Sequence, residues 1–183
     1  MAYRSNLGDK LKRLARTEKA NFVYDCNHLP GSATSEDTIV WLERIASLKG
    51  ILEADKGKEK HWFDETQRSE LLKTLEDRAT MLFFGDLNPI YGEMCQKVDE
   101  WNAAPKNLEE RGSYMGVLKP SLIQWITSAK SQVNYILYVA PTLYVPERAS
   151  GVALYNSLDG YLEMVADNQE LEIPTIEGLT RRT

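Results

Sequence analysis

The chain has 183 residues, of which 43% are hydrophobic and 27% are charged. This is the mixture of one ordinary globular domain, so the composition argues against a chain that is disordered throughout. The net charge is −5, but residues 1–19 hold six basic side chains against two acidic ones, so a basic N-terminal segment precedes an acidic remainder.

Three absences indicate the compartment. The sequence begins without the apolar run of a signal peptide, and no window reaches the ~20 apolar residues of a transmembrane helix. Cys26 and Cys95 lie far apart and form no CxxC pair, which argues against a disulfide scaffold. We therefore expect no transmembrane segment, and a protein in the cytoplasm of a cell or an infected host cell, or within a virion.

Apolar residues recur at helical spacing along most of the chain. The spacing predicts six helices, over residues 6–18, 34–55, 64–85, 88–105, 120–139 and 149–166. The expected fold class is all-α, a single bundle of about five to seven helices with a basic N-terminal helix. We expect three parts: a basic amphipathic segment over 1–20, the bundle over 21–167, and an extended C-terminal arm over 168–183.

Glycine and proline set the expected helix ends. Gly85 is placed to end one helix, and Asn88-Pro89 favours the start of the next. Residues 21–33 and 106–118 are predicted to be loops. The stretch Tyr135–Val139 is rich in strand-favouring residues, so a strand is an alternative to the helix end there.

The pattern changes after Asn168. Pro174 forbids a long helix, while the apolar residues recur too regularly for a solvated tail. We expect an arm whose apolar side chains contact a neighbouring subunit, which predicts a homo-oligomer. The alternative is that the arm folds back over its own bundle. The expected subunit contacts are Leu171, Ile173, Ile176 and Leu179.

Two segments could meet nucleic acid. One is residues 56–63, where lysines stand beside Trp62 and Phe63, which could stack on bases or could instead fix a helix start to the core. The other is the N-terminal segment, whose cations could neutralise phosphates or dock on an acidic protein or membrane surface. Its candidate contact residues are Arg4, Lys10, Lys12, Arg13, Arg16 and Lys19.

Asp25, Cys26 and His28 bring three reactive side-chain types together within four residues. Zinc sites usually have two clusters of paired ligands, and only one such cluster occurs here. An enzyme that uses these three residues remains an alternative. No glycine-rich phosphate loop and no Gly-x-Ser-x-Gly motif occurs, so the sequence predicts no metal, cofactor or catalytic site.

These observations favour a non-enzymatic structural or assembly protein that self-associates through its terminal arms, of the kind that builds viral or phage particles. The alternative is a nucleic-acid-binding coat or regulatory protein that uses the basic N-terminal segment.

Overall fold

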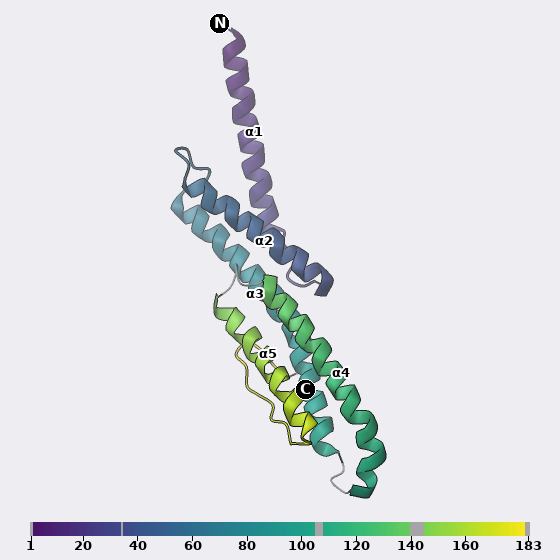
Figure 1. The fold of residues 1–183 in the computed structure, drawn as a ribbon. Helices are drawn as coiled ribbons and strands as arrows, with labels where there is room; N and C mark the ends of the chain where they lie inside the picture. Colours follow the sequence, from purple (N-terminus) through teal and green to yellow (C-terminus); the bar gives the residue numbers. More distant parts are fainter. Residues whose placement is uncertain (1, 34, 105–107, 140–144, 182–183) are drawn as a thin grey trace. The chain divides into compact units, whose positions relative to one another are not determined.

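The structure is a computed structural model that describes residues 2–33, 35–104, 108–139 and 145–181, with side chains from residue 12 onward except at 14, 35–36, 108–115, 139 and 145–146. The described residues form helices and loops without a strand, which confirms the all-α fold class. The helices are α1 (Ala2–Asn27), α2 (Ser35–Lys56), α3 (Glu65–Ala103), α4 (Leu108–Val139) and α5 (Val145–Ala166) (Figure 1).

The chain divides into two compact units, Met1–Met81 and Leu82–Thr183, where the sequence predicted one bundle. The division falls within α3, so this helix contributes its first part to one unit and its second part to the other. Within the described ranges, no helix is both long and apolar enough to cross a membrane.

In the first unit, α1 packs against α2. The loop predicted over 21–33 is wrong in its first half, because α1 continues to Asn27. Phe22 and Cys26 lie about one helical turn apart and are both buried, so the helical conformation places both side chains in the core. The apolar core of this unit comes from all three helices and from the end of the connector before α3. It includes Phe22, Cys26, Leu42, Ile45, Leu48, Leu52, Phe63, Leu71, Leu75 and Ala79.

The start of α3 has a capping box. Asp64 Oδ1 accepts a hydrogen bond from the N–H of Gln67 at 2.8 Å, and Gln67 Oε1 accepts one from the N–H of Asp64 at 3.3 Å. Two donors that would otherwise lack a partner in the first helical turn are thereby satisfied.

The helix break predicted at Gly85 and Pro89 is wrong, since α3 continues through both residues. Proline removes the N–H that would bond to the carbonyl four residues earlier, but here both positions are exposed, so water can solvate that carbonyl. The same spacing recurs in α4, where Gly116 and Pro120 are also exposed. The loop predicted before Pro120 is accordingly helical from Leu108 onward.

The second unit contains the remainder of α3 together with α4 and α5, and the last two helices pack against each other. The stretch Tyr135–Val139 is the helical end of α4, not a strand. The core includes Phe83, Leu87, Met94, Val98, Ile126, Val133, Leu154, Leu158 and Val165.

The C-terminal segment (residues 169–181) turns back after α5 and lies on the second unit (Figure 1). Its neighbours on α3 run from Trp101, which bonds to Gln169, down to Phe84, which lies beside Gly178. This part of the segment therefore runs antiparallel to α3.

Candidate functional site

One face of α1 changes character along its length. Positions 12, 16, 19, 23 and 27 share that face, because steps of three and four residues follow the helical period. At its C-terminal end, Val23 and Asn27 line a cavity against α3. Toward the N-terminus the same face carries Lys19, which is half-buried, and then Arg16 and Lys12, which are exposed. The face that lines the cavity thus continues as a cationic stripe (Lys12, Arg16 and Lys19).

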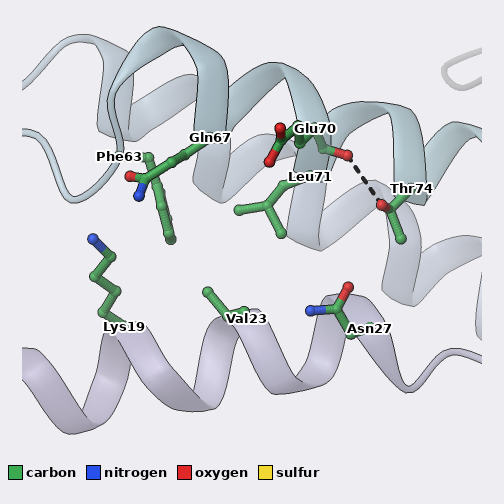
Figure 2. A pocket seen from close by; sticks show the side chains of 8 residues that line it. All are labelled: Lys19, Val23, Asn27, Phe63, Gln67, Glu70, Leu71 and Thr74. Carbon is green, nitrogen blue, oxygen red and sulfur yellow. Dashed lines mark hydrogen bonds between the residues drawn. The ribbon is translucent and has the colours of Figure 1, made fainter.

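The cavity has a volume of about 300 Å³ and lies between α1 and the first part of α3. Figure 2 shows Val23 and Leu71 approaching each other from the two sides, with Phe63 at the end where Lys19 stands. Only Lys19 and Glu70 of its lining side chains ionise, and the remainder are Val23, Asn27, Phe63, Gln67, Leu71 and Thr74. The cavity therefore lacks the convergent titratable groups of an acid–base site.

Lys19 joins the basic N-terminal segment to the lysine-containing connector between α2 and α3 (residues 57–64). Its Nζ lies 4.9 Å from the ring centroid of Phe63. The Phe63 ring meets Trp62 edge to face, with centroids 6.4 Å apart, and Lys58 Nζ lies 5.0 Å from the Trp62 ring centroid. The contacts therefore run from Lys19 to Phe63, from Phe63 to Trp62, and from Trp62 to Lys58. Each ammonium group is attracted by the electron-rich face of its aromatic ring.

The connector is fixed by the carboxylate of Asp55, which is only 1% exposed. Its oxygens accept hydrogen bonds from the N–H of Trp62 at 2.8 Å and of Phe63 at 3.3 Å, and Arg68 Nη2 lies 3.5 Å away. Burial by itself would raise the pKa of Asp55, but the two N–H donors and the guanidinium outweigh it and lower this pKa. His61 Nδ1 also bonds to the Asp55 carbonyl at 2.8 Å. Connector and helix start are thus tied to the end of α2.

The six predicted contact cations differ in what the structure shows of them. Lys19 lies over Phe63. The side chains of Arg4 and Lys10 lie outside the described residues. The other three are exposed, and none forms an ion pair with a carboxylate that the structure describes: Lys12, Arg13 and Arg16. With Lys19, Lys58 and Lys60 they make up what we call the cationic surface of the first unit.

The four predicted subunit contacts lie against the chain's own second unit. Leu171, Ile176 and Leu179 are buried in its core, and Ile173 is partly buried against it. Contact with a neighbouring subunit through these side chains therefore requires the segment to leave this position. Side chains of the second unit hydrogen-bond the backbone of the segment along its length, namely those of Asn88, Tyr91, Trp101, Asn102, Ser150 and Tyr161.

Asp25, Cys26 and His28 are not brought together. Cys26 is fully buried, and burial followed by the charge of Asp25 raises its pKa to about 11, so the thiol stays protonated at neutral pH. The exposed His28 stacks on Tyr24 with ring centroids 3.7 Å apart, while Asp25 pairs with Arg44 at 2.6 Å. Among the described residues there is also no group of three side chains suited to hold a metal ion.

Sequence reasoning missed the role of Asp55. A usable indication was present, since Asp55 follows Leu48 and Leu52 at helical spacing and so occupies a core position of α2. A carboxylate at such a position must find donors, and here it finds them in the connector. No family model, curated protein or solved structure matches the chain.

Proposed function

We propose that the chain is a non-enzymatic nucleic-acid-binding protein of the coat or regulatory kind, with α1 as its main contact. The observation that carries this proposal is the exposure of Lys12, Arg13 and Arg16 without a described carboxylate partner. Exposed cations about one helical turn apart can neutralise successive phosphates and release their counterions.

The distribution of charge supports a localised contact. The first 19 residues carry +4, and the remainder of the chain carries −9. A polyanion is repelled by such a remainder and is drawn to the end where cations gather. The protonated, buried thiol of Cys26 and the cavity without convergent acids or bases add support for a binding role over a catalytic one.

Fluorescence anisotropy with a labelled oligothymidylate tests this function. The double variant R13A/R16A is expected to bind at least about tenfold more weakly and to reduce the salt slope by about one to two. The matched control K73A/R148A removes two exposed cations elsewhere and is expected to bind like the natural chain. Binding that ignores salt, or an equal loss in both variants, would contradict the proposal.

Self-association through the C-terminal segment is a second candidate. It is favoured by the way the segment is held, because the groups that bind its backbone would fit the same segment from a second copy equally well. Light scattering tests this. A mass that is a multiple of 20.8 kDa, and that falls to one chain on deletion of residues 169–183, supports exchange, whereas the mass of one natural chain contradicts it.

A further inference from the structure

We infer that α1 and the connector form a single binding surface for single-stranded nucleic acid, in which Trp62 stacks on an unpaired base while Lys19 and Lys58 contact the flanking phosphates. This inference rests on the proposed function and names the class of nucleic acid that the same surface takes. The sequence contains the two basic segments as separate stretches, and the structure brings them into contact through Phe63.

The two aromatic side chains have different parts in this surface. Phe63 is 3% exposed and packs on Phe22 with ring centroids 5.6 Å apart, so it belongs to the core and fixes the position of Lys19. Trp62 is only partly buried and lies between Phe63 and the exposed Lys58. Trp62 is therefore the ring that a base can reach, and a base that stacks on the face covered by Lys58 must displace this ammonium group toward a phosphate.

The backbone of Trp62 is also held in place before any ligand binds. The N–H of Trp62 donates to the buried carboxylate of Asp55 at 2.8 Å, and that carboxylate is oriented by Arg68. A platform whose backbone is fixed loses less conformational freedom on binding than a mobile loop does. Asp55 and Arg68 thus position the platform without touching the ligand.

The presence of the ring decides between single and double strands. Cations alone favour a duplex at least as much as a single strand, because the duplex has the higher charge density. Base stacking on an aromatic side chain requires bases that are not already paired and stacked, and every base can supply such a face. One accessible ring, Trp62, with Lys19 and Lys58 on its two sides therefore fits a single strand without a strong sequence preference.

The decisive experiment measures anisotropy of a labelled oligothymidylate and of a duplex of equal length, with the full chain and with W62L. The substitution is expected to weaken single-strand binding about five- to a hundredfold and to leave duplex binding within about twofold. W125L is the matched control, because Trp125 is also partly buried and also has a lysine over its ring, Lys97 at 5.6 Å, but it belongs to the second unit. A second variant, K58A/K60A, tests the connector without altering an aromatic side chain.

The outcomes separate this inference from the proposed function. If R13A/R16A weakens binding while W62L and K58A/K60A do not, the inference is overturned and the proposed function stands. If no nucleic acid binds in a salt-dependent way, both the inference and the proposed function are contradicted. Equal competition by polyglutamate and oligothymidylate overturns the inference in favour of an acidic protein partner, and a W62L chain that prefers single strands as strongly as the natural chain overturns it as well.

Discussion

The side-chain amide of Asn102 pairs with the backbone of Leu171 in the way that a neighbouring strand would. Its Nδ2 donates to the Leu171 carbonyl at 2.7 Å, and its Oδ1 accepts the Leu171 N–H at 2.9 Å. An extended segment without a strand beside it must satisfy its backbone groups by such means or expose them to water. The pair therefore fixes the segment at the point where Leu171 enters the core.

Replacing Asn102 by alanine removes both hydrogen bonds at once. We expect N102A to lower the free energy of unfolding of the second unit by about 2–3 kcal/mol, because the N–H and the carbonyl of the buried Leu171 both lose their hydrogen-bond partner. Hydrogen exchange at the Leu171 amide should accelerate in parallel. N156A, at an exposed position of α5, is the control and should leave both quantities nearly unchanged.

Gly178 is required by its conformation and by its neighbour. Its φ is +78°, and a Cβ there would lie 2.7 Å from the Phe84 ring. G178A is therefore expected to destabilise the packed C-terminal segment by roughly 1–3 kcal/mol, seen as faster limited proteolysis after α5. G160A is the matched control, since a Cβ at this position in α5 meets nothing, and it should stabilise the helix by about 0.5–1 kcal/mol. Equal effects of the two changes would show that the close approach to Phe84 is unimportant.

Acid should weaken the first unit through Asp55. Its folded pKa lies below the unfolded value of 3.8, so its stabilisation is complete above that value and is lost as the pH falls through the folded pKa. D55N should lower stability at neutral pH by about 3 kcal/mol, because the N–H groups of Trp62 and Phe63 lose a charged acceptor and the buried Arg68 guanidinium keeps only the exposed Glu65 as its counter-charge. Urea unfolding followed by Trp fluorescence at pH 7 and pH 3 measures both effects. A D55N chain as stable as the natural one at pH 7 would refute this role.

The two thiols should react slowly while the chain is folded. Burial raises the pKa of Cys26 to about 11 and also raises that of Cys95, so at pH 8 little thiolate forms at either residue. Iodoacetamide labelling followed by mass spectrometry should give little modification at pH 8 and full modification in denaturant. Rapid labelling of Cys26 in the folded chain would restore the enzyme alternative based on Asp25, Cys26 and His28.

Local patterns in the sequence predicted the all-α class and the approximate positions of α2 and α5, because their apolar residues repeat at helical spacing without interruption. The break predicted at Gly85 and Pro89 was wrong because a local rule was applied where tertiary structure decides. The rule that proline ends a helix considers only the hydrogen bond that proline removes. In α3 the carbonyl of Gly85, which loses this bond, is at an exposed position where water can solvate it. The exposure of this position is set by tertiary structure, which the local sequence pattern does not contain.

The C-terminal segment shows a different limit. Its pattern indicates that Leu171 and Ile176 should be buried, but it does not indicate against which surface. That surface depends on partners such as Trp101 and Asn102, which lie about 70 positions earlier in the chain. The contact of Lys19 with Phe63 is equally non-local, so the sequence suggested two basic segments but not that they adjoin.

Lysine footprinting tests most directly whether the cationic surface of the first unit is where the chain meets nucleic acid. The chain is acetylated with and without saturating oligothymidylate, and modification at each lysine is measured by mass spectrometry. We predict that Lys12, Lys58 and Lys60 become protected while the exposed Lys73 does not. Protection that is absent, or that spreads evenly over both units, would contradict the assignment of this surface.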